Sequence, residues 1–204
     1  MSRPHDRYQG QRGARPEDAR RPVGARGALR PALDLGALPS GRAMVIVDEG
    51  MVRAPLRTIF DLARDVERWP ERLRHYRYVR FTERALDGGG IVDMSAYRQF
   101  GVVGWPTFWR SEMQVLDGAS GTFGPLIRYR HIGGVTRGMD VAWEFAETRG
   151  GTHVRIVHVW DGPSVPVVGS VVATTIIGPI FVHGIASRTL AGLAAVAERQ
   201  EQSR

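Results

Sequence analysis

Residues 54–80, APLRTIFDLARDVERWPERLRHYRYVR, lie between two segments with the composition of β-strands. Pro55 suits the first turn of a helix, where its missing N–H is not needed. One apolar helix face follows, with members at i, i+3, i+4 and i+7: Leu56, Ile59, Phe60 and Ala63. Asp65 is predicted to cap a second short helix, and Trp69-Pro70 to end the pair. The sequence therefore predicts a strand, two short helices and entry into a sheet.

Strand-like segments precede and follow this region, and short turns separate those that follow. Glycine-containing turns are predicted at 87–88, 117–118 and 150–151, because Gly adopts the positive φ that tight hairpins require. Such short connections favour an antiparallel meander. The predicted strands span residues 44–52, 76–86, 91–100, 107–116, 123–132, 139–146 and 152–160.

Residues 162–187 contain no Asp, Glu, Lys or Arg and are followed by a helix-forming segment, 188–199. The uncharged run is long enough to span a bilayer. Two prolines, Pro166 and Pro179, and the lack of a basic stop-transfer flank argue against a membrane span. A helix lying in the concave face of a curved sheet is also apolar on most sides. We therefore predict one long C-terminal helix packed inside the sheet.

The net charge of +7 is concentrated in an N-terminal tail. Residues 1–42 carry nine Arg and four acidic residues, whereas the remainder carries nineteen Arg and seventeen acidic residues. The tail has few large apolar side chains, so we predict that residues 1–42 are disordered and that residues 43–204 form one domain. The nearly neutral domain argues against nucleic-acid binding. The absence of Cys excludes disulfides, and no export signal is evident, so a cytoplasmic location is expected.

The order of these elements resembles the helix-grip fold of the SRPBCC superfamily, which includes the START and birch-pollen-allergen-like proteins. Within it, the chain most resembles the polyketide cyclase/dehydrase (aromatase/cyclase) branch. The resemblance covers residues 44–200 and is carried by Ala54-Pro55, Asp65-Val66, Trp69-Pro70-Glu71, Gly150-Gly151-Thr152 and Ile177-Gly178-Pro179. It implies an α+β fold with about seven curved antiparallel strands around the C-terminal helix. It also implies a deep cavity for a lipid, quinone, polyketide or similar hydrophobic molecule.

Alternation along the strands indicates which side chains face this cavity. We predict a lining of aromatic and aliphatic groups with a few polar tips, because apolar pockets with a few polar groups are typical ligand sites. The predicted ligand-binding residues are Trp69, Tyr97, Trp109, Ser111, Met113, Tyr129, Trp143, Trp160 and Phe181.

The resemblance also implies a catalytic pattern, which the chain matches only in part. Aromatase/cyclases use an inward arginine on a central strand and a tyrosine after the Trp-Pro helix. Tyr76 matches the tyrosine, but Met113 lies near the arginine position. His131 and His158 are further candidates for proton transfer. For each of the three, the alternative interpretation is a hydrogen-bonded core residue. His153 and His158 lie on opposite strand faces, so no metal site is expected, and no cofactor is implied.

Three functions remain open from the sequence. The first is binding of a hydrophobic small molecule, with the apolar helix making a peripheral membrane contact during ligand exchange. The second is polyketide cyclisation or dehydration of a bound poly-ketone. The third is an interaction subunit that docks through the tail or the apolar helix. A homodimer is compatible with each of them.

Overall fold

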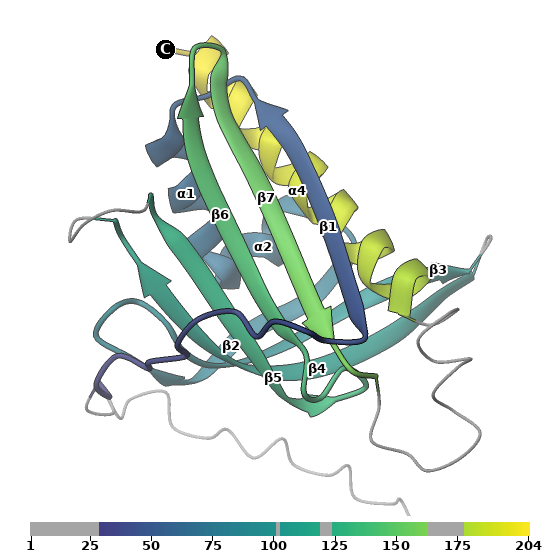
Figure 1. Cartoon of the computed structure of the whole chain (residues 1–204). Coiled ribbons are helices and arrows are strands. Elements are labelled where there is room, and N and C mark those ends of the chain that lie inside the picture. Colours follow the sequence, from purple (N-terminus) through teal and green to yellow (C-terminus); the bar gives the residue numbers. More distant parts are fainter. Residues whose placement is uncertain (1–28, 101–102, 119–123, 163–177) are drawn as a thin grey trace, which may run out of the picture.

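The computed structural model describes residues 29–100, 103–118, 124–162 and 178–204. It confirms the predicted α+β architecture, in which one curved antiparallel sheet surrounds a long C-terminal helix (Figure 1). The helices are α1 (Leu56–Arg64), the 3-10 helix η1 (Val66–Arg68), α2 (Trp69–Arg72) and α4 (Gly178–Gln202). The strands are β1 (Met44–Val52), β2 (Tyr76–Arg84), β3 (Gly90–Phe100), β4 (Val103–Leu116), β5 (Leu126–Gly134), β6 (Asp140–Thr148) and β7 (Gly151–Trp160).

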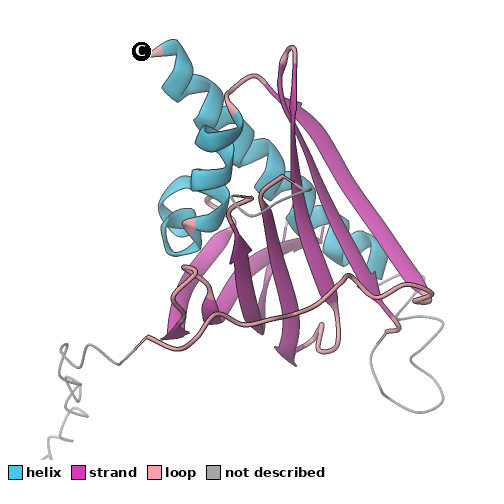
Figure 2. Cartoon of the chain, turned by 60° about the vertical axis from the view of Figure 1, so that its left-hand side comes forward, coloured by secondary structure: helices cyan, strands magenta, loops and turns pink. Residues whose placement is uncertain are grey.

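The seven strands are ordered β1-β7-β6-β5-β4-β3-β2, and every neighbouring pair is antiparallel. Strands β2 to β7 form the predicted meander, and β1 joins it at the β7 edge. Helix α4 runs along β1 and contacts β3 and β7 (Figures 1 and 2). The concave face of the sheet and α4 therefore enclose the main apolar core.

The segment that suggested the fold differs from the prediction at one junction. Trp69-Pro70 begins α2 instead of ending the helical pair, and Leu73 terminates it. The reason is that Pro at the first helical positions loses no backbone hydrogen bond. Asp65 lies at the predicted cap position but makes no side-chain cap bond, because its carboxylate accepts a hydrogen bond from Arg72 at 3.1 Å.

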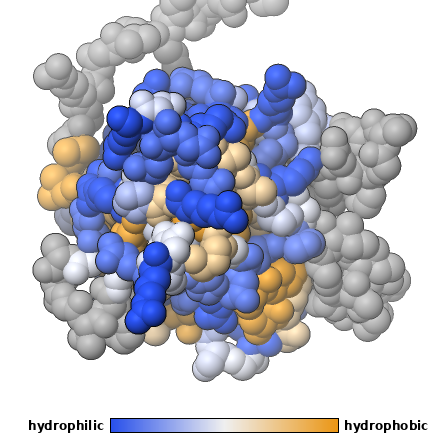
Figure 3. All heavy atoms as spheres, turned by 90° about the horizontal axis from the view of Figure 1, so that it is seen from above, coloured by the Kyte–Doolittle hydropathy of each residue, from blue (hydrophilic) through white to orange (hydrophobic). Residues whose placement is uncertain are grey.

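The C-terminal helix begins at Gly178 in the described part of the chain, and residues 163–177 of the uncharged run lie outside it. No helix within the described residues combines the length and apolar character needed to cross a membrane. Seen from the end at which α4 stops, the described surface is mainly hydrophilic, with exposed hydrophobic residues in small patches (Figure 3).

Part of the predicted disordered tail, residues 29–42, lies within the described part of the chain. Residues 29–42, which we call the N-terminal strap, lie against the outer face of the sheet instead of being disordered. Arg30 forms an isolated bridge with Ala85, and the side chain of Leu35 is only 5% exposed. The strap also covers Arg128, which is 2% exposed and donates from Nη1 to the carbonyl of Gly36 at 2.6 Å. A few specific contacts thus hold an Arg- and Pro-rich segment on the domain.

Replacement of Leu35 by Ala should lower the free energy of unfolding by about 2 kcal/mol, because it removes a buried side chain from the strap. Leu29→Ala is the matched control, since Leu29 is 55% exposed and its loss should change stability by less than about 0.5 kcal/mol. Urea unfolding of both variants measures the difference. Equal effects of the two substitutions would show that the strap does not dock in solution.

Candidate functional site

A cavity lies between the concave face of the sheet and α4. It holds about 570 Å³ of space free of protein atoms, including solvent at its mouth, and the centre of a water molecule can occupy about 70 Å³ of that space. Its walls are formed by Trp69, Tyr76, Met94, Trp109, Tyr129, His131, Thr136, Met139, Val141, Trp143, Ile156, His158, Val182, Ile185, Ala186 and Thr189.

Aromatic rings follow one another along the cavity wall. His131 stacks on Trp109 with ring centroids 6.2 Å apart, and Trp109 meets the edge of Tyr76. Tyr76 in turn packs against Trp69 at 5.2 Å, and Trp69 against Trp143 at 5.7 Å. These rings come from β5, β4, β2, α2 and β6. Their interlocked packing gives the cavity a rigid, mainly apolar wall.

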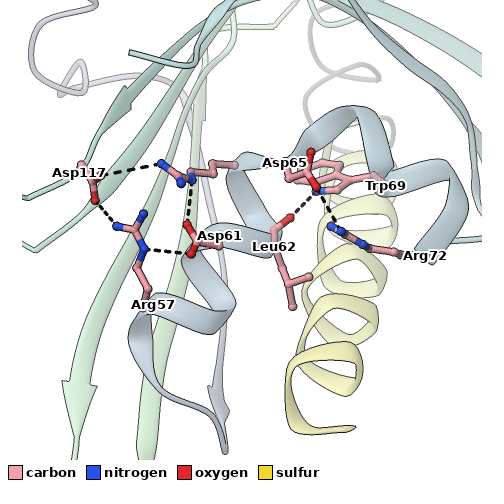
Figure 4. Close-up of polar contacts among 8 residues, drawn as sticks. Arg57, Asp61, Leu62, Asp65, Trp69, Arg72 and Asp117 are labelled. Atoms are coloured by element: carbon pink, nitrogen blue, oxygen red, sulfur yellow. Dashed lines mark hydrogen bonds and ion pairs between the residues drawn. The ribbon is translucent and has the colours of Figure 1, made fainter. Parts of the chain in front are cut away.

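The orientation of Trp69 is fixed from α1. Its indole Nε1 donates to the carbonyl of Leu62 at 3.1 Å (Figure 4). On the outer side of α1, Arg57 donates to Asp61 at 2.9 Å and to Asp117 at 2.7 Å, which ties the helix to the end of β4 (Figure 4). The fold around Trp69-Pro70 therefore positions one wall of the cavity.

The hydroxyl of Thr189 on α4 links the side chains of Tyr76, the first residue of β2, and of His75, which precedes the strand. It donates to the carbonyl of Ile185 at 2.7 Å, so its lone pairs must accept from its other neighbours. The Tyr76 hydroxyl lies 3.2 Å away and His75 Nε2 lies 3.1 Å away. This arrangement makes Tyr76 a donor to Thr189 and places the His75 proton on Nε2. The free lone pairs of the Tyr76 oxygen remain available to accept a hydrogen bond from a ligand.

Replacing Thr189 by Val should lower the free energy of unfolding by about 1–3 kcal/mol, because the buried Tyr76 hydroxyl loses its acceptor while the side-chain shape is kept. Thr189→Ser keeps the hydroxyl and should cost less than Thr189→Val. Urea unfolding compares the two. A smaller loss for Val than for Ser would show that the hydroxyl contributes nothing to stability.

Two other polar groups in the cavity wall lack a hydrogen-bond partner among the described residues. The hydroxyl of Tyr129 and Nδ1 of His158 are buried and make no hydrogen bond to any described residue. His131 differs, since its Nδ1 lies 2.6 Å from the Thr136 hydroxyl. Burial lowers the pKa of His131 and of His158 to about 3, and it raises the pKa of Tyr76 and of Tyr129. All four groups are therefore uncharged at neutral pH.

The structure brings together most of the predicted site residues. The proposed catalytic residues Tyr76, His131 and His158 line the cavity together with Trp69, Trp109, Tyr129 and Trp143. Alternation predicted the inward direction of the strand residues Trp109, Tyr129, His131, Trp143 and His158, whereas Tyr76 was predicted from the resemblance.

The other predicted ligand-binding residues lie elsewhere. Tyr97 is 43% exposed and has Arg77 over its ring, because its strand position faces outward. Ser111 and Met113 face inward but are fully buried outside the cavity wall. Trp160 is also core, with Nε1 donating to the carbonyl of Arg137 at 3.0 Å. The side chain of Phe181 lies outside the described part of the chain.

Sequence reasoning missed the α4 side of the cavity. Val182, Ile185, Ala186 and Thr189 follow one another at i, i+3, i+4 and i+7, which is the spacing of one helix face. That spacing could have identified them. This spacing was hard to recognise in the uncharged run, because apolar residues occupy nearly all positions around the helix.

No charged side chain lines the cavity among the described residues. Met113, which the resemblance places near the family's inward arginine, is buried on β4, while Arg110 pairs with Asp93 on the outer face at 2.6 Å. Arg188 donates from Nε to the carbonyl of Gly184 and from Nη2 to the carbonyl of Tyr97. In the part of the chain that the structure covers, no group of three His, Asp or Glu side chains could hold a metal ion.

Comparisons with solved structures support the fold. The ZhuI aromatase/cyclase from Streptomyces sp. R1128 aligns with a TM-score of 0.64 and 15% identity, covering 78% of this chain and 95% of that one. The di-domain aromatase/cyclase StfQ of the steffimycin pathway gives 0.62 and 21%, covering 78% of this chain and 52% of that one. A START superfamily protein from Mycobacterium smegmatis gives 0.56 and 15%, covering 76% and 98%. At these identities, the likeness shows a common fold.

A search of curated protein sequences finds no significant match. The family described as polyketide cyclase/dehydrase and lipid transport matches residues 52–176, more than half of the chain. The match begins at the end of β1 and includes α1, α2 and strands β2 to β7, the elements that form the sheet side of the cavity. The chain therefore belongs to the polyketide cyclase/dehydrase and lipid-transport family.

Proposed function

We propose that this protein binds a hydrophobic small molecule in the cavity between the sheet and α4. The observation that carries the proposal is the aromatic cavity wall, which contains two buried polar groups, the Tyr129 hydroxyl and His158 Nδ1, without partners among the described residues. Buried polar groups in proteins are nearly always hydrogen-bonded. A ligand could cover the apolar wall with its own apolar body. Its polar atoms could form the hydrogen bonds that Tyr129 and His158 lack.

Binding without chemistry is the simplest function for this site. A general base works best when its pKa lies near the operating pH, whereas the pKa of His131 and of His158 is about 3. Stabilisation of an enolate also needs a positive charge or strong donors. Within the described residues, no Arg lines the cavity, so its walls favour a neutral bound molecule.

A polyketide cyclase is the second candidate, and the position of Tyr76 in the cavity favours it. The ZhuI and StfQ structures are those of aromatase/cyclases with the same fold. In this function, the hydroxyls of Tyr76 and Tyr129 would orient a poly-ketone for ring closure. Tyr76→Phe should then change the distribution of cyclised products from a linear poly-β-ketone. An unchanged distribution for Tyr76→Phe and for His131→Ala would exclude this candidate.

The binding function can be tested with N-phenylnaphthylamine, an uncharged apolar fluorophore that accepts excitation energy from tryptophan. Trp69, Trp109 and Trp143 all line the cavity and serve as built-in donors. Titration of the full chain should quench tryptophan emission and saturate at one probe per chain. A signal that rises linearly without saturation would contradict a defined binding site.

A further inference from the structure

The two unpartnered polar groups of the cavity occupy one row across the inner face of the sheet. Tyr129 on β5 pairs with Val141 on β6, and Val141 pairs with His158 on β7. All three residues line the cavity. Their backbones are two strand spacings apart, about 10 Å between the outer two. The shorter Val141 side chain lies between the two polar residues in this row.

Neither polar group belongs to a hydrogen-bond network among the described residues. Tyr129 is 4% exposed and His158 is 8% exposed, and both lack a hydrogen-bond partner in the described part of the chain. Tyr76 and His131 contrast with them, because their polar atoms contact Thr189 and Thr136. The cavity wall thus contains two polar groups with partners and, on either side of Val141, two that have none among the described residues.

The charge of the cavity restricts what these groups can bind. The described cavity wall contains no Asp, Glu or Arg side chain, and the two histidines in it are uncharged because burial lowers their pKa to about 3. A carboxylate or an ammonium group would lose its hydration there without gaining a counter-ion. A hydroxyl or a carbonyl can instead bind the Tyr129 hydroxyl or His158 Nδ1 as an uncharged group.

We propose that Tyr129 and His158 are specificity-determining residues that select uncharged ligands bearing a hydroxyl or carbonyl oxygen over pure hydrocarbons and over carboxylates. This inference rests on the proposed binding function. The Tyr129 hydroxyl donates to or accepts from the ligand oxygen, and His158 Nδ1 does the same according to its tautomer. The aromatic wall holds the apolar body of the ligand.

A matched series of three ligands tests the selection. Naphthalene, naphthol and naphthoate share one ring system and differ in the polar group. Each is used at pH 7 to displace N-phenylnaphthylamine from the full-length protein. Naphthol should bind about tenfold more tightly than naphthalene, the difference expected for one net hydrogen bond. Naphthoate should bind at least about tenfold more weakly than naphthol, because its charge is not compensated.

Two variants assign the selection to the proposed residues. Tyr129→Phe removes one oxygen atom that has no partner among the described residues, so the fold should be unaffected, and His158→Leu removes the second polar group. Each variant should reduce the preference for naphthol over naphthalene while naphthalene still binds. Tyr78→Phe is the control, because Tyr78 is partly exposed, with Arg80 over its ring, and lies outside the cavity wall.

The outcomes separate this inference from the binding function. Equal displacement by the three ligands, or a naphthol preference unchanged in both variants, would overturn the selection by Tyr129 and His158 and leave the binding function standing. Failure of the fluorophore itself to bind with saturation would remove the binding function, and the inference with it. Loss of the preference in either cavity variant but not in Tyr78→Phe is the result that supports it.

Discussion

Ala186→Phe is expected to abolish binding of N-phenylnaphthylamine. Ala186 lies on the face of α4 that lines the cavity, and its side chain is 6% exposed. A benzyl group at this position extends into the free space and occupies the volume that a ligand needs. We expect the affinity to fall at least about a hundredfold, or about 3 kcal/mol, because the apolar contacts of the ligand are lost together. Fluorescence titration measures the change.

The matched control for this variant is Ala191→Phe, on the exposed side of the same helix. It adds the same side chain to α4 without entering the cavity. Its affinity for the fluorophore should equal that of the wild-type protein, and both variants should retain the circular dichroism spectrum of the native fold. Similar binding by Ala186→Phe and the wild type would show that the probe binds outside the cavity.

Acidification from pH 7 to pH 4.5 is expected to destabilise the protein. His158 has a native-state pKa of about 3, against about 6.5 in the unfolded chain. The unfolded state therefore binds more protons below pH 6.5, and the stability that the neutral ring contributes is lost as the pH falls from 6.5 towards 3. Between pH 7 and pH 4.5 this histidine alone should lower the free energy of unfolding by about 3 kcal/mol.

Comparison with His158→Asn isolates this contribution, because Asn does not titrate. His75 and Asp48, whose pKa values are also shifted, are present in both proteins and cancel in the difference. His131 also cancels, apart from its coupling to His158. The difference in unfolding free energy between wild type and variant should decrease by about 3 kcal/mol from pH 7 to pH 4.5. Urea unfolding across this range measures it, and a constant difference would show that His158 is not buried in its neutral form.

Much of the sheet could be predicted from the sequence because its strands carry a regular alternation. Val141, Trp143 and Phe145 share one face of β6, and the structure buries all three. Strand β1 was predicted at the residues where it is found. Alternation predicts on which face of the sheet a side chain lies, but not whether it reaches the cavity. Met113 and Trp109 share an inner face, yet only Trp109 reaches the cavity.

The features that sequence reasoning missed depend on contacts between distant residues. The N-terminal strap docks through Leu35 and through backbone carbonyls that accept from Arg128 and Arg130. Composition could not predict this docking, because every residue has a backbone carbonyl. Only the fold brings particular carbonyls next to Arg128 and Arg130. Thr189 was missed for a similar reason, since its role comes from the meeting of α4 with β2.

Mass spectrometry of extracts from the native protein tests the binding function most directly. Wild-type protein and Ala186→Phe are purified from the native host under identical conditions, denatured and extracted into organic solvent. The cavity should yield about one equivalent of an uncharged apolar compound bearing oxygen from the wild type, and the filled variant should yield little. Equal recovery from both proteins, or no compound from the wild type, would contradict the assignment of this cavity as the ligand site.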